Sequence, residues 1–342
     1  MKKIFLLTCI LFSIQLMAQP GKDGALIISS ANYVVNKYCP VSVNISPGSS
    51  AFVLATGSSF GLCPGDLVMI YQAQGAAIDV TNTPVYGNIT SYNSAGLYEF
   101  KYIQSVNANT ITVQTTFTNS YASTGKIQMI KVPQYTSLTI NPGGNLTPRA
   151  WKDTTIAGTP YRLGGLVVVH ATNILNNGSI SATGSGFRGG QQNNNSAYPF
   201  GVTSFASGSM GDGGEKGEGI SGSTADYDTN GGRYCRGAAA NGGGGANSVN
   251  SSGGGGANGF NGNTWNGQGV MIVNAGNLLS AWTLDPGYIA NGNALTNSSG
   301  GGRGGYSWGA SASNPTVTAP GTPSWLGDAR REIGGLGGRP LT

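Results

Sequence analysis

The sequence predicts an all-β protein: a first domain of β-sandwich or barrel type, followed by a glycine-rich β-solenoid with polyglycine II-like segments. Three observations support this fold class. Short runs of alternating apolar and polar residues recur in the first 140 residues, with turn residues between them. No stretch shows a capped amphipathic helix. Of the 58 glycines, 45 lie in residues 164–342, where only close packing of bare backbones keeps the chain ordered.

Residues 1–18 have the features of a secretory signal peptide. Lys2 and Lys3 precede an apolar run over residues 4–16, and Ala18 provides a small residue at a cleavable position. The run is shorter than the ~20 apolar residues that a membrane-spanning helix needs. We therefore expect a secreted protein, extracellular or at the cell surface, whose mature chain has no membrane span.

Residues 19–145 are predicted to form the strand-rich first domain. In the segment 110–114, Ile111 and Val113 share one face while the threonines and Gln114 share the other, as in a half-buried strand. Turn signals such as Pro64-Gly65-Asp66 separate the predicted strands. The predicted strands cover residues 25–30, 33–38, 41–46, 51–56, 66–73, 96–106, 110–117 and 126–140.

Residues 146–163 are predicted to be a connection, and residues 164–342 the solenoid. A strand over residues 166–172, a turn at 176–178 and a strand over 179–183 match one coil of a parallel β-helix. Further on, residues 242–247 and 253–258 share the sequence GGGGAN. Such runs predict extended chains lying side by side. A flexible linker is the alternative, but linkers rarely contain as many aromatic residues as this segment.

Charge is sparse: 9% of residues are charged and the formal net charge is +5, which falls to about +3 without Lys2 and Lys3. The usual charged fraction of a soluble domain is about 25%. The arginines are scattered along the chain, so we expect no nucleic-acid partner. No Cys/His ligand set is present, and we expect no metal and no cofactor.

The cysteines allow one disulfide prediction. Cys39 and Cys63 are each followed by proline and lie in the first domain, where a bridge between them suits an oxidising compartment. Two separate buried thiols are the alternative. The third mature cysteine, Cys235, lies in the glycine-rich part.

Candidate ligand contacts are Trp265, Tyr306 and Trp308, because aromatic rings beside Asn, Gln and Thr are typical of carbohydrate-binding or protein-binding surfaces. Core packing is the alternative role for each. A polysaccharide-acting enzyme would instead need two carboxylates at a defined separation. The acidic residues available for such a pair in the glycine-rich part are Asp212, Glu215, Glu218, Asp226 and Asp228.

Several stretches together resemble the amino-terminal part of large secreted surface proteins of Bacteroidota, the gliding-associated and adhesin-like substrates of type IX secretion. The resemblance covers most of the mature chain. It implies a surface or adhesive role, export by a secretion machinery and further segments after residue 342, but no catalytic residues. It is carried by residues 64–72 (PGDLVMIYQ), 86–100, 125–135, 185–190 (SGFRGG) and 334–340 (GGLGGRP).

The function expected from these features is non-enzymatic: an extracellular surface protein with an adhesive or structural role, whose partners are surface glycans or proteins. Two alternatives stay open. One is a polysaccharide-acting enzyme on a β-helix scaffold, which requires carboxylates that face one groove. The other is a passive stalk that spaces domains encoded downstream.

Overall fold

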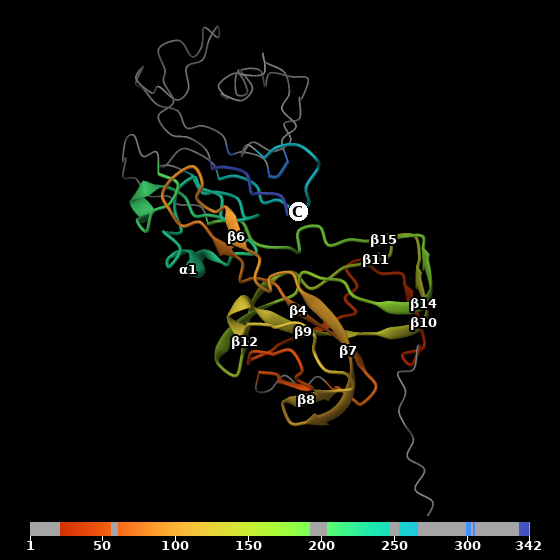
Figure 1. Cartoon of the computed structure of the whole chain (residues 1–342). Helices are drawn as coiled ribbons and strands as arrows, with labels where there is room; N and C mark the ends of the chain where they lie inside the picture. The colour runs from red at the N-terminus through yellow and green to blue at the C-terminus, as the bar shows by residue number, and fades with distance from the viewer. Residues whose placement is uncertain are drawn as a thin grey trace, which may run out of the picture.

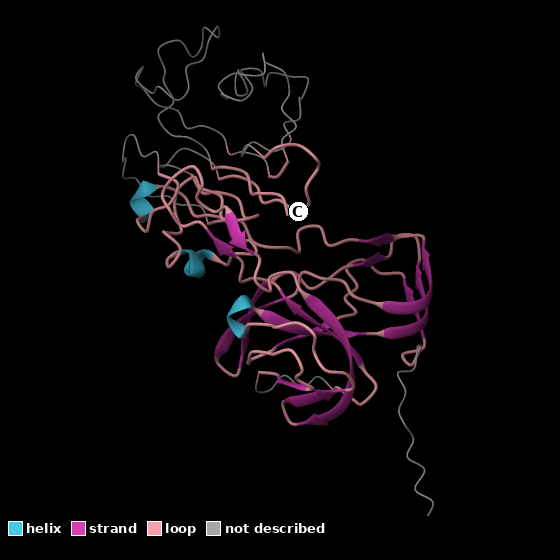
Figure 2. Cartoon of the chain, viewed as in Figure 1, coloured by secondary structure: helices cyan, strands magenta, loops and turns pink. Residues whose placement is uncertain are grey.

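The computed structural model describes residues 21–55, 61–191, 204–246, 253–265, 299–301, 304 and 335–341. The predicted signal peptide lies outside these residues. The described part is almost entirely strands and loops, with three short helical turns (Figure 2). The all-β prediction is confirmed. None of the described helices is long and apolar enough to cross a membrane.

Three turns of the chain stack in parallel register. They are represented by β1 (Ala25–Ile28), β10 (Gln134–Ile140) and β14 (His170–Asn176), and by the shorter pair β11 (Asn145–Leu146) and β15 (Ser179–Ile180). Leu138 of the middle strand pairs with Leu26 on one side and Ile174 on the other. Figure 1 shows β10, β14, β11 and β15 together on the right of the molecule. Burial of Leu138, Ile140 and Leu146 between these turns stabilises the stack.

A six-stranded antiparallel sheet is inserted between the first and second turns of this stack. Its strand order is β2-β9-β4-β7-β8-β3. Ile111 and Val113 of β8 are buried while the intervening Thr112 is less so, as the alternation predicts. The bounds are β2 (Lys37–Pro40), β3 (Ala51–Val53), β4 (Leu67–Gln72), β7 (Tyr98–Asn107), β8 (Thr110–Val113) and β9 (Ile127–Val132).

Strand β4 is buried on both faces, which explains its nearly continuous apolar sequence. Val68 and Ile70 belong to the core on one side of the sheet. Leu67 and Met69 pack into a second cluster on the other side. A strand covered on both faces does not alternate between apolar and polar residues, because neither face meets water.

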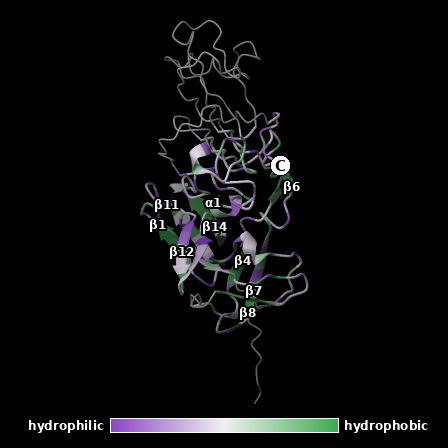
Figure 3. Ribbon diagram, turned by 90° about the vertical axis from the view of Figure 1, so that its left-hand side faces the viewer, coloured by the Kyte–Doolittle hydropathy of each residue, from purple (hydrophilic) through white to green (hydrophobic). Residues whose placement is uncertain are grey.

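The segment 146–163, predicted as a connection, contains a β-hairpin of β12 (Lys152–Ile156) and β13 (Thr159–Leu163). Its turn is made by Ala157 and Gly158, both at positive φ, as two-residue hairpin turns require. Leu163 packs against the second face of the six-stranded sheet, while β12 is largely hydrophilic and contrasts with the apolar β1 in Figure 3. The hairpin therefore covers the sheet.

The predicted strand 166–172 begins later, at His170. Residues 166–169, which precede this strand, are held by hydrogen bonds from side chains near the six-stranded sheet and not by backbone pairing with a strand. The Asn36 amide donates to the carbonyl of Val168 at 2.6 Å and accepts from its N–H at 2.9 Å. Tyr38 donates its hydroxyl to the Leu166 carbonyl at 2.5 Å. These bonds join the stack to the sheet.

Four glycine-rich segments, residues 214–219, 236–246, 253–258 and 335–341, lie against one another, and we call them the glycine bundle. The N–H of Gly244 donates to the Leu336 carbonyl and the N–H of Gly254 to the Gly244 carbonyl, both at 2.8 Å. A Cβ on Gly244 would overlap the carbonyl oxygen of Arg236. Backbones at this separation leave no space for side chains, so glycine is required there.

Large rings supply the apolar burial that the glycines lack. Tyr86 and Tyr227 are fully buried and pack with Phe205, Ile220 and alanines of the bundle. A small hairpin between β4 and β7 contributes Ile78 to this cluster. The remaining elements are β5 (Ala77–Ile78), β6 (Ile89–Ser91), η1 (Ser123–Gly125), η2 (Met210–Asp212) and α1 (Thr224–Tyr227).

Candidate functional site

A cavity of about 480 Å³ lies between the hairpin β12–β13, the start of α1 and the chain around η1. Its volume falls within the range of small-molecule binding sites. Four separate parts of the sequence meet here, residues 40–42, 123–127, 153–162 and 223–226, so no local motif marks the cavity. The residues that line it are Pro40, Val41, Ser42, Ser123, Lys126, Ile127, Asp153, Pro160, Tyr161, Arg162, Ser223, Ala225 and Asp226.

Asp226 is positioned by a capping box at the start of α1. Its Oδ2 accepts hydrogen bonds from the backbone N–H of Ser223 at 2.8 Å and from the Ser223 hydroxyl at 2.7 Å. This reciprocal arrangement satisfies N–H groups that a helix start otherwise leaves unpaired. Asp226 lines the cavity, and among the described residues none donates a hydrogen bond to its Oδ1.

Lys126 lines the cavity and occupies a strained backbone position. Its φ is 58°, in the left-handed region that lysine seldom occupies, and it ends the helical turn η1. Strain of this kind persists only where the surrounding structure imposes it. Within the part of the chain that the structure describes, the Lys126 ammonium forms no hydrogen bond or ion pair.

Tyr161 and Arg162 are placed by β13. Tyr161 is half-buried and packs against the second face of the six-stranded sheet. Its hydroxyl makes no hydrogen bond to a described residue. Arg162, by contrast, is fully engaged: its Nε donates to Oδ1 of Asp153 at 2.7 Å, and its Nη1 forms an ion pair with Glu218.

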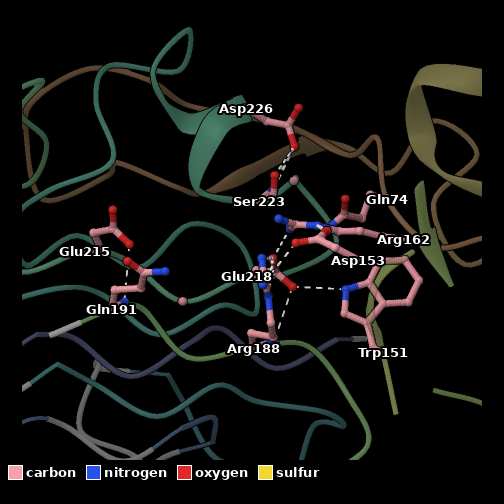
Figure 4. A network of polar contacts seen from close by, with 12 residues as sticks. Gln74, Trp151, Asp153, Arg162, Arg188, Gln191, Glu215, Glu218, Ser223 and Asp226 are labelled. Atoms are coloured by element: carbon pink, nitrogen blue, oxygen red, sulfur yellow. Dashed lines mark hydrogen bonds and ion pairs between the residues drawn. The ribbon is translucent and has the colours of Figure 1, made fainter. Parts of the chain in front are cut away.

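A charged network that includes the cavity residues Asp153 and Arg162 centres on the buried Glu218 (Figure 4). Oε2 of Glu218 accepts from the Trp151 indole at 3.0 Å, and Oε1 accepts from Nη2 of Arg188 at 2.9 Å. Asp153 binds both arginines, Arg162 and Arg188. The two carboxylates thus balance two guanidinium groups, which is how proteins accommodate buried charge.

The electrostatics of Asp153 suit a permanent anion. Partial burial alone raises a carboxyl pKa, but the hydrogen bond from Arg162 and the charges of Arg162 and Arg188 outweigh it and hold the pKa of Asp153 below its ordinary value. A general acid in glycoside hydrolysis needs a raised pKa. Asp153 therefore has the properties of a structural ion and not those of a proton donor.

The acidic residues that the sequence offered for a catalytic pair lie in different places. Glu215 pairs with Arg233 at 3.4 Å, and Asp228 pairs with the same arginine. Asp212 accepts from the Ser207 hydroxyl at 2.5 Å. Of the five, Asp226 alone lines the cavity; its carboxylate neighbour there is Asp153, which sequence reasoning did not put in the pair.

A second cavity, of about 220 Å³, has Trp151 in its wall. It is more apolar and includes Tyr71, Leu166 and Phe187. The Trp151 and Phe187 rings meet edge to face with centroids 5.5 Å apart. Burial raises the pKa of the Tyr71 hydroxyl.

Trp265 is the one described residue among the three predicted ligand contacts. Its indole donates to the Gly337 carbonyl at 3.2 Å, and the Arg339 guanidinium lies 4.1 Å from its ring centroid. Trp265 thus packs on the glycine bundle and lines neither cavity. Tyr306 and Trp308 lie outside the described residues.

The predicted disulfide between Cys39 and Cys63 is not formed in the structure. Cys39 is buried in β2, whereas Cys63 is exposed in the loop before β4. Burial raises the pKa of Cys39 well above its ordinary value, so this residue behaves as a core thiol. The alternative, two separate buried thiols, holds for Cys39 but not for Cys63, which is exposed.

Sequence reasoning missed Lys126, Asp153 and Tyr161. A hairpin signal was present for two of them, since Ala157-Gly158 lies between short runs that pair as strands. Lys126 carried no signal, because a left-handed lysine is visible only in the folded backbone.

No protein-family model matches the chain, and no curated protein matches it. Among solved structures, the tailspike gp61 of Pseudomonas phage phi297 is 14% identical, with a TM-score of 0.22 over 37% of this chain and 20% of that one. The gp54 tailspike of Acinetobacter baumannii bacteriophage AP22, in complex with A. baumannii capsular saccharide, is 15% identical. Its TM-score is 0.23 over 46% of this chain and 27% of that one. The tailspike protein gp49 of Pseudomonas phage LKA1 is 16% identical, with a TM-score of 0.20 over 36% of this chain and 26% of that one. The chain spans about a quarter or less of each tailspike.

Proposed function

We propose that this protein is a non-enzymatic, extracellular surface protein that adheres to surface glycans through the cavity between β12–β13 and α1. One observation carries the proposal. The cavity combines a half-buried aromatic ring, Tyr161, with polar groups that no described residue engages, while its remaining charges neutralise one another. Ring faces together with a few convergent polar groups are the usual means of binding polar ligands.

The scaffold fits an adhesive role in several ways. The parallel stack of β1, β10 and β14 is the geometry of a solenoid, and the hydrogen-bonded glycine segments resemble polyglycine II packing; we propose both descriptions for the residues concerned. A scaffold with 9% charged residues has few charge pairs for salt to screen. The apparent signal peptide supports a location outside the cell.

The experiment is a glycan array probed with the purified chain and, in parallel, with its Tyr161→Ala variant. The expected result is binding to a restricted set of glycans, weakened at least tenfold by the substitution, with every bound glycan recovered intact. Tyr98→Ala is the control, because Tyr98 is 57% exposed and does not line the cavity. This variant should bind glycans as the wild type does. Absence of binding to any glycan or cell surface contradicts the proposal and favours a passive stalk.

A second candidate function has its own supporting observation. Asp153 and Asp226 line the same cavity, as a polysaccharide-acting enzyme requires. Incubation with polysaccharides and measurement of newly formed reducing ends tests it. Turnover that disappears in both Asp153→Asn and Asp226→Asn variants supports the enzyme; intact polysaccharide after prolonged incubation supports adhesion.

A further inference from the structure

Two opposite charges line the 480 Å³ cavity without pairing. Lys126 and Asp226 both contribute to its wall, yet neither takes part in any ion pair of the described residues. Both residues are half-buried. Charged groups that are partly removed from water gain most from hydrogen bonds to a partner. The Lys126 ammonium and Oδ1 of Asp226 can therefore each form a hydrogen bond with a ligand in this cavity.

The other charges of the cavity wall are already used. Asp153 and Arg162 bind each other, and Arg162 also binds Glu218 behind the wall. The formal charges of the cavity wall therefore sum to zero. Two charged groups of the wall have no partner among the described residues: Oδ1 of Asp226, an acceptor, and the Lys126 ammonium, a donor. Tyr161, Pro40 and Pro160 contribute apolar surface to the same cavity.

We propose that this cavity binds a neutral sugar residue of a glycan through hydrogen bonds with both Lys126 and Asp226. This inference rests on the proposed glycan-binding function and names the ligand class of the same site. One sugar hydroxyl accepts a hydrogen bond from the Lys126 ammonium, and another donates to Oδ1 of Asp226. The apolar face of the sugar ring lies on Tyr161.

A neutral sugar is favoured over a charged one because hydroxyl groups both donate and accept. A single polyhydroxylated ring satisfies an ammonium and a carboxylate at once, each through a charge-assisted hydrogen bond. A sugar carboxylate bound to Lys126 would share the cavity with the carboxylates of Asp153 and Asp226, and a sugar ammonium bound to Asp226 would share it with Lys126 and Arg162. Like charges brought together in this way cost binding free energy.

The test is calorimetric titration of the purified chain with tetrasaccharides of glucose, mannose and galactose, with tetragalacturonate and with a glucosamine tetramer. We expect at least one neutral tetrasaccharide to bind tenfold or more tightly than either charged one. Lys126→Met and Asp226→Asn should each weaken that binding about tenfold or more, as expected for loss of a charge-assisted hydrogen bond. Asn at 226 keeps an oxygen for the Ser223 N–H, so α1 retains its cap.

Matched controls use residues outside the cavity. Lys152→Met removes an exposed lysine of β12, and Asp23→Asn changes a carboxylate that also accepts a backbone N–H, from Gln134 at 2.7 Å. Both controls should bind as the wild type does. Thermal unfolding of all four variants confirms that each is folded.

The outcomes separate this inference from the function on which it rests. Preference for tetragalacturonate or for the glucosamine tetramer overturns the neutral-sugar inference and leaves glycan binding standing. Neutral binding that is unchanged in Lys126→Met and Asp226→Asn overturns the assigned site. Failure of every tetrasaccharide to bind, together with a blank glycan array, overturns the proposed function itself.

Discussion

Trp151 donates its indole N–H to Oε2 of Glu218 at 3.0 Å, and this bond joins the hairpin region to the glycine bundle. Glu218 also accepts from the backbone N–H of Arg188 at 3.3 Å. The carboxylate is buried, with 1% of its side chain exposed. One buried acid therefore binds residues of two other segments, Trp151 and Arg162 in one and Arg188 in the other.

Replacing Glu218 with alanine should destabilise the protein by about 3–5 kcal/mol, because the change leaves Arg162, a largely buried cation, without one of its two carboxylates. Urea unfolding measures the difference. Asp153→Ala is the matched control: it removes the other carboxylate bound to the same arginines, but its side chain is 54% exposed, and about 1 kcal/mol or less is expected. Equal losses for both variants would contradict the central role of Glu218.

Gly244→Ala should lower the free energy of unfolding by about 3 kcal/mol or more, since the added methyl group overlaps the backbone of Arg236 and that backbone has no flexible end to move. Gly259→Ala is the control, because a Cβ there meets no atom within 4 Å and its φ is not in the left-handed region. For this control we expect a change between zero and a gain of about 1 kcal/mol. Thermal or urea unfolding of both variants gives the comparison, and equal stabilities would show that the bundle is not closely packed.

Stability should rise with pH between about 7 and 8.5 because of Lys216. Its side chain is fully buried, and its ammonium donates to the carbonyls of Phe205 and Cys235 at 2.6 and 2.8 Å. Burial lowers its pKa from 10.5 to about 7. Between these values the unfolded chain binds more protons than the folded chain, so raising the pH favours folding, with a slope of at most about 1.4 kcal/mol per pH unit.

Ionisation of the buried thiols has the opposite effect on stability, and it sets the upper limit of the pH range in which stability rises. Burial raises the pKa of Cys235 to about 12, so ionisation of this thiol in the unfolded chain reduces stability above roughly pH 8.5. Urea unfolding at several pH values, with Lys216→Met beside the wild type, isolates the lysine contribution. A pH-dependent rise that persists in Lys216→Met would refute the assignment.

Cys63 should react with a thiol reagent in the folded protein, whereas Cys39 and Cys235 should react only after unfolding. The first is exposed and the other two are buried. Peptide mapping by mass spectrometry after brief alkylation, with and without urea, identifies each modified position. Detection of a Cys39–Cys63 linked peptide in the untreated protein would contradict the structure.

Patterns with a short period were predictable from sequence. The alternation at Ile111 and Val113 predicted a strand with one buried face, and β8 has that face. A period of two residues is a local property of an extended chain and needs no knowledge of neighbours. The lack of an amphipathic helix likewise predicted an all-β protein.

Pairings between distant segments were not predictable in this way. Sequence reasoning assigned residues 25–30 and 126–140 to the first domain and residues 166–183 to the solenoid. In the structure, Leu26, Leu138 and Ile174 are neighbours in one parallel sheet. Each strand has an apolar pattern that many partners would satisfy, so the choice depends on the whole chain.

The candidate site depends on tertiary structure to an even greater degree. Lys126 comes from the end of η1, directly before β9, Tyr161 from the hairpin β12–β13, and Asp226 from the start of α1 in the glycine-rich part. No spacing in the sequence relates them. The sequence by itself determined the β character, the low charge and the need for bare backbone in the second half, because these follow from the properties of individual residues and their nearest neighbours. Only the tertiary structure decided which strands stack, which charges are neutralised and which remain available to a ligand, since burial and distance exist only once the chain has folded.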